Sequence, residues 1–248
     1  MIICKSPEEI EKMRRSGRLV REILGEIRQR VRPGVSTLEL EKYTAKRLAE
    51  VGARPAFKGY RGYPCCLCTS VNDQIIHGIP SDRRLKEGDV LSVDLGVVLD
   101  GFYGDSAITI PVGEISEGAK KLLRVTEEAL ERAIEKVRPG NRLGDVSAAV
   151  QEHVENHGFS VVREFVGHGI GRELHEEPQI PNFGPPGRGP MLKEGMVLAI
   201  EPMVNAGSPA SRVLDDQWTA VTVDGEYSAH FEHMVAVSGN GPDVLTRW

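Results

Sequence analysis

A repeated order of predicted helices and strands constrains the fold of this chain more than any other feature. Residues 31–34, Val-Arg-Pro-Gly, return 106 positions later at 137–140. Residues 85–94 return 107 positions later at 192–201, where Asp94 is matched by Glu201. Common turn chemistry explains one match, but a nearly constant offset through two separated segments favours an internal duplication. We therefore predict a single domain, 1–248, made of two similar halves at approximately 1–111 and 112–248.

Each half is predicted to begin with helices and continue with strands. Ser6, Pro7 and Glu9 form a capping box with proline at the first helical position. Apolar residues then recur at helical spacing over 10–31, before Pro-Gly at 33–34. Further helices are expected over 36–51 and 116–137, and strands over 67–71, 218–223 and 230–237, with Asp224-Gly225 as a hairpin turn. This order predicts an α+β fold in which helices cover one face of an antiparallel sheet and leave the other open.

Two acidic residues share one face of a predicted hairpin. Asp100-Gly101 separates two β-branched apolar runs, which is a strong signal for a two-residue turn. This register places Gly96 opposite Asp105 and makes Asp94 a diagonal neighbour of Asp105, with Cβ atoms roughly 7 Å apart. If the hairpin lay at the surface, each acid would simply be solvated by water. As a pair among Val, Leu and Ile they repel each other, so we expect a divalent cation between them.

Three further residues extend this candidate metal site. A single histidine is usually a satisfied polar residue, but glycines on both sides of His168 let the backbone approach another group. Glu201 matches Asp94, and Glu232 is expected to correspond to Asp105. Four carboxylates and an imidazole suit a pair of Mn, Fe, Co or Zn ions better than Mg, Ca or a structural zinc. Such a pair activates water and hydrolyses amides or phosphate esters.

Two loop histidines, His77 and His175, are candidates for contact with a substrate. They could stabilise a carbonyl oxygen that becomes an oxyanion, or protonate a leaving amine. Hydrogen bonds to nearby backbone are an equally good interpretation of their spacing.

Composition narrows the partners and the compartment. A net charge of -5 argues against nucleic acid as the main partner. No apolar run approaches the length of a membrane span, and the first residues lack a signal-peptide pattern, so we expect a cytoplasmic protein. A Cys-x-x-Cys at 65–68 has no second pair for zinc and precedes no helix, so the cysteines are expected to be reduced thiols in or beside the core.

Seven short segments together resemble a type I methionine aminopeptidase over nearly the whole chain. They are 72–80 (Asn-Asp-Gln-Ile-Ile-His-Gly-Ile-Pro), 93–96, 104–105, 167–171 (Gly-His-Gly-Ile-Gly), 175–178, 200–202 and 231–233. The resemblance implies the pita-bread fold, with two pseudo-symmetric halves around a dinuclear metal site. It implies removal of the initiator methionine from nascent polypeptides, near the ribosome, when the second residue is small and uncharged. The chain resembles the short bacterial form, and we expect a monomer.

The resemblance also assigns roles to the metal-site residues. Asp94 and Asp105 would hold one metal ion. The other metal ion would be held by four residues: Asp105, His168, Glu201 and Glu232. Of these, Asp105 and Glu232 would bridge the two ions. Glu201 would also accept a proton from the attacking water. His77 would act near the leaving nitrogen, and His175 would bind the substrate carbonyl.

A pocket for the methionine side chain follows from the same resemblance. Its walls would be Phe57, Tyr60, Tyr63, Cys68, Leu174 and Trp218, which are soft, polarizable surfaces suited to a thioether. Many relatives carry Phe at the position of Leu174 and a small thiol at that of Phe57, so the shape of this pocket departs from the family pattern.

Three alternatives remain beside this assignment. An Xaa-Pro peptidase of the same fold normally carries a large N-terminal domain, for which the chain has no room. A non-catalytic pita-bread binding protein loses metal ligands, whereas all five are present here. A two-metal phosphoesterase would be expected to have basic residues near the acids, and none lies beside them in the sequence.

Overall fold

The computed structural model describes residues 1–247 and has the predicted α+β class. The first half contains α1 (Pro7–Arg28), α2 (Thr37–Glu50), β1 (Arg54–Pro55), the 3-10 turn η1 (Tyr60–Gly62), β2 (Leu67–Val71), β3 (Gln74–Ile76), β4 (Val90–Leu99) and β5 (Phe102–Pro111). The second half contains α3 (Glu117–Glu135), α4 (Leu143–Asn156), β6 (Ser160–Val161), β7 (Gly167–Gly169), β8 (Glu176–Ile180), β9 (Val197–Ile200), β10 (Met203–Asn205), β11 (Ser211–Val213), β12 (Ala220–Thr222), β13 (Ser228–His230), β14 (His233–Ser238) and β15 (Gly241–Val244). Within residues 1–247, no helix is long and apolar enough to cross a membrane.

Local sequence signals explain where the helices begin and end. The Ser6 side chain accepts a hydrogen bond from the Glu9 amide, which confirms the predicted capping box. Ser36 and Glu39 form the same box at the start of α2. α1 ends at Arg28, about one turn earlier than the apolar pattern indicated. There the hydrogen bonding changes, because the Arg30 amide donates to Ile27 O at 2.8 Å, three residues back, and the chain turns at 29–30 before Pro33.

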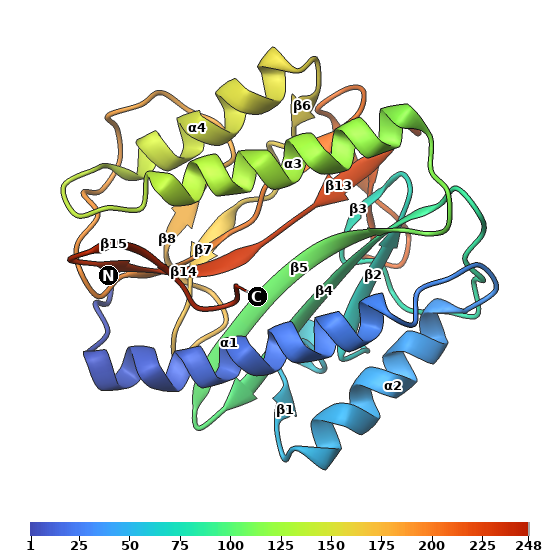
Figure 1. Cartoon of the computed structure of the whole chain (residues 1–248), viewed down its shortest axis with the longest axis horizontal. Helices are drawn as coiled ribbons and strands as arrows, with labels where there is room; N and C mark the ends of the chain where they lie inside the picture. Colours follow the sequence, from blue (N-terminus) through green and yellow to red (C-terminus); the bar gives the residue numbers. More distant parts are fainter. Residues whose placement is uncertain (248) are drawn as a thin grey trace.

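The helices cover the sheets on one side of the molecule (Figure 1). α1 and α2 pack on the sheet of β5, β4, β2 and β1, while α3 and α4 pack on the second-half strands. Each helix pair buries its apolar face in a separate core, because an amphipathic helix must cover its apolar stripe. The largest second-half sheet has the order β15-β14-β9-β7-β8.

Positions that the repeat aligns have equivalent hydrogen bonds. The Gly34 amide donates to Leu85 O at 2.8 Å, and the Gly140 amide donates to Leu192 O at 3.1 Å. Isolated bridges join 36 to 84 in the first half and 142 to 191 in the second. The two halves therefore share local structure where their sequences match.

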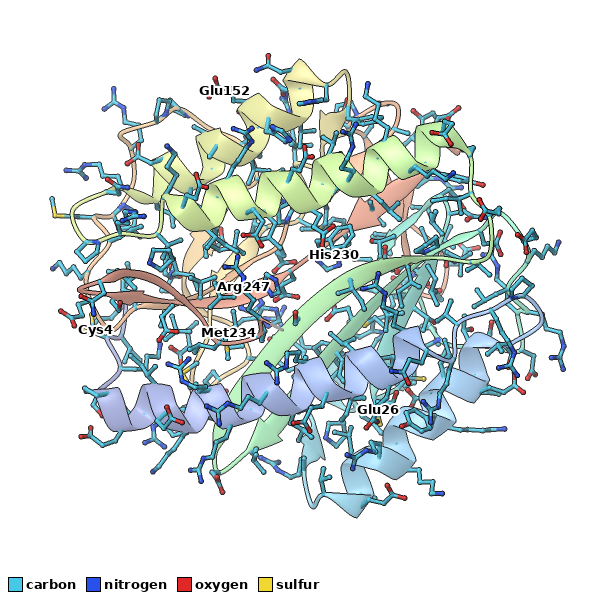
Figure 2. The ribbon with its side chains drawn as sticks, in the orientation of Figure 1. Cys4, Glu26, Glu152, His230, Met234 and Arg247 are labelled. Carbon is cyan, nitrogen blue, oxygen red and sulfur yellow. The ribbon has the colours of Figure 1, made fainter. Side chains whose placement is uncertain are left out.

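Polar contacts from β5 join the two halves. The Ser106 hydroxyl donates to Glu232 O at 2.5 Å, and the Thr109 hydroxyl donates to His230 O at 2.8 Å. The Glu232 amide donates to Ala107 O at 2.9 Å. Figure 2 shows His230 near the middle of the molecule, between the two helix pairs. This join brings the segment that carries Glu232 against β5.

The first hairpin has the predicted register. Gly96 pairs with Asp105 and Leu99 pairs with Phe102. Asp100 and Gly101 have φ values of 53° and 79°, as a two-residue turn between twisted strands requires.

The predicted hairpin at Asp224-Gly225 is wrong. β12 pairs with β11 and β3, whereas β13 pairs with β10 and β14 pairs with β9 and β15. The Asp224 carboxylate accepts from the Ser208 and Glu226 amides, so it stabilises a turn that directs the next segment to a different sheet. The predicted strand 230–237 is also interrupted at 231–232, where the Glu232 amide bonds β5 instead of a ladder partner.

Candidate active site

The residues predicted for the site line one cavity of about 200 Å³. The predicted residues that line the cavity are Phe57, Tyr60, Tyr63, Cys68, His77, Asp94, Asp105, His168, Leu174, His175, Glu201, Trp218 and Glu232. Arg61, which was not predicted, also lines it. These side chains come from both halves and from the loops between them, so the cavity lies where the halves meet.

The five candidate metal ligands come from strands and strand ends. Asp94 and Asp105 project from β4 and β5, which are paired so that both side chains share one face. His168 is the central residue of β7. Glu201 directly follows β9, and Glu232 lies in the interruption between β13 and β14. Rigid strands therefore hold most of the set, as a preformed site requires.

His168 is oriented toward the carboxylates. Its Nδ1 bonds the Gly169 carbonyl oxygen at 3.0 Å, and because a carbonyl can only accept, Nδ1 carries the proton. Nε2 then carries the free lone pair of the ring and lies 3.5 Å from Glu201 Oε1 and 4.0 Å from Asp105 Oδ2. Donor atoms of Asp105, His168 and Glu232 all lie within 4.8 Å of one another. A backbone carbonyl on the second nitrogen is the usual support of a metal-ligating imidazole.

Several carboxylate oxygens of this group are buried without a hydrogen-bond partner. They are Asp94 Oδ1, Asp105 Oδ1 and Glu232 Oε1. Asp105 is 4 % exposed and Glu232 is 2 % exposed. Buried carboxylates are normally paired or bound to metal, because leaving them unpaired costs several kcal/mol, on the order of 3–5 for a broken buried pair. The residues present therefore fit divalent cations.

Burial and mutual repulsion shift the protonation of the site. Burial, reinforced by neighbouring carboxylates, raises the pKa of Asp94, Glu201 and Glu232 well above their ordinary values. Burial also raises the pKa of Asp105 to about 7 and lowers the pKa of His168 to about 3. A bound cation would lower the pKa values of the carboxyls again, because it favours their ionised form, and it would bind the imidazole in the neutral form that burial already favours.

His77 lies in the cavity with an unusual backbone. Its φ is 59°, in the left-handed region that non-glycine residues rarely adopt. Edge-to-face contacts with Phe165 and Trp218, at centroid distances of 5.9 and 6.2 Å, hold the ring. Burial lowers the pKa of His77 to about 4, so the ring is neutral at physiological pH.

His175 contacts a tyrosine and the metal-site histidine. The Tyr60 hydroxyl bonds His175 Nδ1 at 2.7 Å. The ring centroid of His175 is 4.3 Å from that of His168. Burial lowers the pKa of His175, and the positive charge of Arg61 lowers it further. A neutral ring whose Nδ1 accepts from Tyr60 carries its proton on Nε2, which makes Nε2 a hydrogen-bond donor.

One wall of the cavity is aromatic and apolar. Phe57, Tyr63, Cys68 and Leu174 are all buried. Tyr63 packs edge-on against Trp218 at 5.0 Å and donates its hydroxyl to Leu67 O and Gly78 O. Gly96 allows Phe57 to approach, because a Cβ at position 96 would lie 2.6 Å from the Phe57 ring. All four cysteines are free, and Cys66 and Cys68 are buried, as predicted, whereas Cys4 is exposed at the surface and does not lie in the core.

Two residues near the centre were missed by the sequence analysis. Arg61 lines the cavity from the 3-10 turn, with φ at 48°. His230 is almost completely buried, and its Nε2 lies 3.7 Å from Glu201 Oε2. Arg61 lies between two glycines in an irregular loop, and the apolar pattern around His230 predicts only a strand. Neither position has a periodic signal that points into the cavity.

Comparison with known proteins agrees with this arrangement. The model of metallopeptidase family M24 matches residues 11–239. The chain is 54 % identical to methionine aminopeptidase 1 of Bacillus subtilis over 247 residues, which covers 100 % of both proteins. It is 54 % identical to the methionine aminopeptidase of Clostridium perfringens, over 99 % of both.

Solved structures show the same fold. The methionine aminopeptidase of Thermotoga maritima has a TM-score of 0.98 at 51 % identity, with 100 % of both chains covered. The prolidase of Pyrococcus horikoshii has a TM-score of 0.81 at 23 % identity, and the match covers 64 % of that chain. The second likeness concerns the fold alone.

The chain therefore belongs to metallopeptidase family M24, whose pita-bread fold was predicted. Within that family, its resemblance to the methionine aminopeptidases is confirmed over the full length of the chain.

Proposed function

We propose that this chain removes the initiator methionine from the N-termini of nascent polypeptides when the second residue is small and uncharged. The observation that carries this proposal is the cavity in which a buried cluster of carboxylates and His168 borders a soft, aromatic wall. The full-length similarity to methionine aminopeptidases supports the choice of substrate.

Five residues are proposed to hold two divalent metal ions: Asp94, Asp105, His168, Glu201 and Glu232. Their unpartnered buried oxygens and the outward lone pair of His168 are the donors that Mn, Fe, Co or Zn ions use. Bound there, the ions would supply Lewis-acid chemistry and a water nucleophile at neutral pH.

The protein's own side chains would then position the peptide and move protons. Glu201, enclosed between His168 and His230, would accept the proton of the attacking water. His175 would donate Nε2–H to the carbonyl oxygen as negative charge develops on it, because Tyr60 holds Nδ1 as the acceptor. His77 would lie near the scissile amide and its leaving nitrogen.

The aromatic wall would bind the methionine side chain. Tyr63 and Trp218 present aromatic rings, and buried Cys68 adds a polarizable sulfur. Leu174 and Phe57 complete the wall, with Tyr60 at its more exposed side. The size of this pocket would select methionine as the first residue of the peptide. The entrance to the cavity would limit the size of the second residue.

The remaining parts of the proposal concern the protein as a whole. We propose that residues 1–248 act as one catalytic domain of two halves. The chain would work as a monomer in the cytoplasm, close to the ribosome, because its proposed substrates are newly made N-termini.

The decisive experiment compares two peptides under controlled metal content. The metal-stripped protein receives Mn, Fe, Co or Zn, one at a time, and is incubated with Met-Ala-Ser or Met-Lys-Ser. We expect free methionine from Met-Ala-Ser, little from Met-Lys-Ser, and none without metal. A folded protein that binds two ions but releases no methionine with any metal would contradict the proposal. It would favour another N-terminal residue or a binding role.

A further inference from the structure

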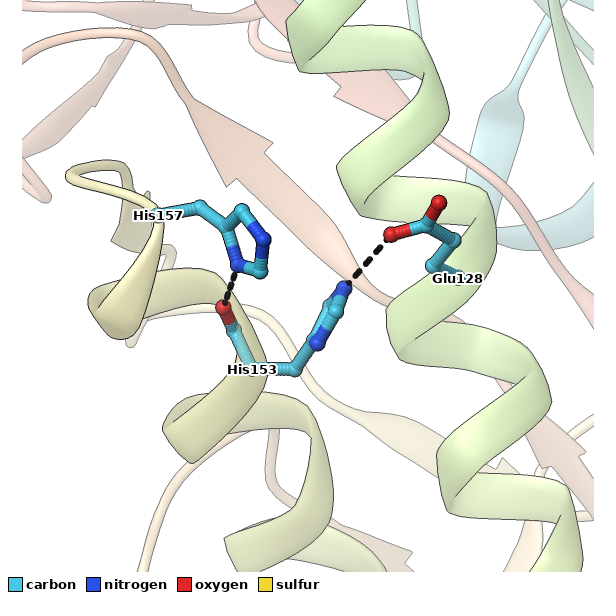
Figure 3. Close-up of side chains that lie close together, drawn as sticks. All are labelled: Glu128, His153 and His157. Atoms are coloured by element: carbon cyan, nitrogen blue, oxygen red, sulfur yellow. Dashed lines mark hydrogen bonds and ion pairs between the residues drawn. The ribbon is translucent and has the colours of Figure 1, made fainter.

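A second group of metal-ligating side chains lies between α3 and α4. Glu128 comes from α3, His153 comes from α4, and His157 is the C-cap residue of α4. One donor atom of each lies within 4.8 Å of the others. Figure 3 shows the three side chains turned toward one another across the space between the helices. The groove beside them shares no lining residue with the catalytic cavity.

The two histidines have the spacing and orientation of metal ligands. Residues four apart lie on the same face of a helix, and the ring centroids of His153 and His157 are 4.4 Å apart. His157 Nδ1 donates to the His153 carbonyl oxygen at 2.7 Å, which leaves the lone pair of Nε2 free. Metal-ligating imidazoles are typically held in this way through their second nitrogen.

Glu128 completes the group from the facing helix. Its Oε2 lies 3.0 Å from His153 Nε2 (Figure 3). The Glu128 side chain is 44 % exposed and that of His153 is 6 % exposed. The group is thus anchored on its inner side and open on its outer side, where water can complete the coordination of an ion.

The surroundings permit a cation. His153 and His157 line a groove of about 930 Å³. Its basic lining residues, Arg132 and Lys136, are offset by four acidic ones: Glu135, Asp145, Glu152 and Glu155. Lys121, which also lies near, donates its ammonium to the His157 carbonyl oxygen at 2.9 Å.

We propose that Glu128, His153 and His157 form a further binding site for a borderline divalent metal ion, of which Zn²⁺ fits best. Two imidazoles and one carboxylate with a water molecule are a common tetrahedral zinc environment. Binding requires the ring proton of neutral His153 to move from Nε2, where it bonds Glu128 Oε2, to Nδ1, so that the Nε2 lone pair and the carboxylate both face the ion, which then links α3 to α4. This site does not depend on the proposed peptidase reaction.

The test counts bound zinc in variants of the full chain. Wild type, Glu128→Gln, His157→Ala and the control Glu152→Gln are dialysed against the same buffered zinc at pH 7.5, and bound metal is measured by atomic emission. Glu152 is an exposed acid on the outer side of α4 (Figure 2), and it lines the groove without belonging to the group. We expect Glu128→Gln and His157→Ala to bind one zinc ion fewer than wild type, and Glu152→Gln to bind as many. Circular dichroism and methionine release with added Mn check that each variant is folded.

A second measurement tests the link between the helices. Zinc should raise the melting temperature of a variant without the central ligands, Asp105→Asn combined with His168→Ala, and adding His157→Ala should abolish that rise. Equal zinc content in wild type and both cluster variants would overturn the proposal. Loss in His157→Ala but not in Glu128→Gln would also overturn it, because Glu128 would then not be a ligand.

Discussion

At the scale of single residues, the site depends on carboxylates that are buried before any substrate arrives. Asp105 pairs opposite Gly96, lies within reach of His168 and Glu232, and has an oxygen without a hydrogen-bond partner. A buried carboxylate of this kind destabilises the folded protein when it has no partner, and it binds a cation that compensates its charge. Its neighbours in the sequence, in contrast, are ordinary strand residues.

Replacing Asp105 with Asn should nearly abolish activity while preserving the fold. The substitution keeps the side-chain shape but removes the charge that would hold metal, and even indirect supporters of a metal site cost about 10–100-fold when mutated. We expect a loss of kcat/KM of at least about 100-fold on Met-Ala-Ser. Asp82→Asn, at an exposed loop position, is the control and should match wild type. Near-normal activity of Asp105→Asn with full metal content would contradict this role.

His175 should affect the chemical step more than substrate binding. Removing a donor to a developing oxyanion costs about 10²–10³ in kcat. We therefore expect His175→Ala to lower kcat by that factor with little change in KM. Tyr60→Phe should show a smaller loss of kcat, because it removes only the hydroxyl that holds Nδ1. Steady-state kinetics on Met-Ala-Ser checks both, and a pure rise in KM would instead indicate a binding role.

At the scale of elements, α1 approaches β5 so closely that only glycine fits. A Cβ on Gly104 would lie 2.7 Å from the Ser16 carbonyl carbon and 2.9 Å from the Gly17 nitrogen. Both neighbours are backbone atoms of a long helix, so they cannot move aside without shifting α1. This contact fixes the distance between the first helix and the hairpin that carries the acids.

Gly104→Ala should therefore destabilise the protein. Overpacking of this kind costs about 1–3 kcal/mol of unfolding free energy. The matched substitution Gly118→Ala in α3, where the nearest outside atom is 3.9 Å away, should instead stabilise by up to about 1 kcal/mol. Urea unfolding of both variants measures the difference. Equal changes in unfolding free energy would show that the close α1–β5 contact does not exclude a Cβ at position 104.

The cap of α4 predicts a pH-dependent contribution to stability. The Asp145 carboxylate accepts from the Arg142 amide at 2.8 Å and from the Gly187 amide at 2.7 Å, and these bonds lower its pKa below 3.8. A carboxyl whose pKa is lower in the folded state stabilises above its unfolded pKa, and this stabilisation is lost as the pH falls through the folded value.

Asp145→Ala should thus lower the unfolding free energy by about 1 kcal/mol at pH 7, the usual value of a helix cap. The difference from wild type should shrink below about pH 4, near the ordinary carboxyl pKa. Thermal unfolding at pH 7 and pH 3 makes the comparison. A difference that stays constant across this range would show that the charge of Asp145 is not what stabilises the cap.

At the scale of the whole molecule, the two halves meet at the acidic cluster. β5 of the first half bonds the 230–232 segment of the second half, and Asp105 and Glu232 lie on either side of this join. Cations bound there would contact residues of both halves. Metal content should therefore influence global stability as well as activity.

Chelation should lower the melting temperature, and added Mn or Zn should restore it. An ion present at 100 times its Kd contributes about 2.7 kcal/mol, because it binds the folded state and not the unfolded chain. For a protein of this size that corresponds to a shift of roughly 5–10 °C. Differential scanning calorimetry measures the shift, and Asp105→Asn should respond less. Identical melting curves with and without metal would contradict binding between the halves.

Much of the fold and part of the site could be predicted from sequence because the signals are local. The capping residues Ser6 and Glu9, the Asp100-Gly101 turn, and the alternation that places Asp94 and Asp105 on one face all depend on neighbours within a few residues. The repeat then predicted that Glu201 would correspond to Asp94, and both line the cavity. Tertiary context decided the path after Thr222, where Asp224 turns the chain to another sheet.

The sequence by itself thus determined where α1, α2 and α3 lie and the register of the first hairpin. Only the tertiary structure decided that Glu232 lies against Asp105, that His230 lies against Glu201, and that Arg61 enters the cavity. The physical reason is that hydrogen-bond registers and turn preferences are satisfied by adjacent residues. The contacts around Glu232, in contrast, depend on a hydrogen bond from its amide to the carbonyl oxygen of Ala107, which is far away in the sequence. No local sequence pattern predicts such a bond.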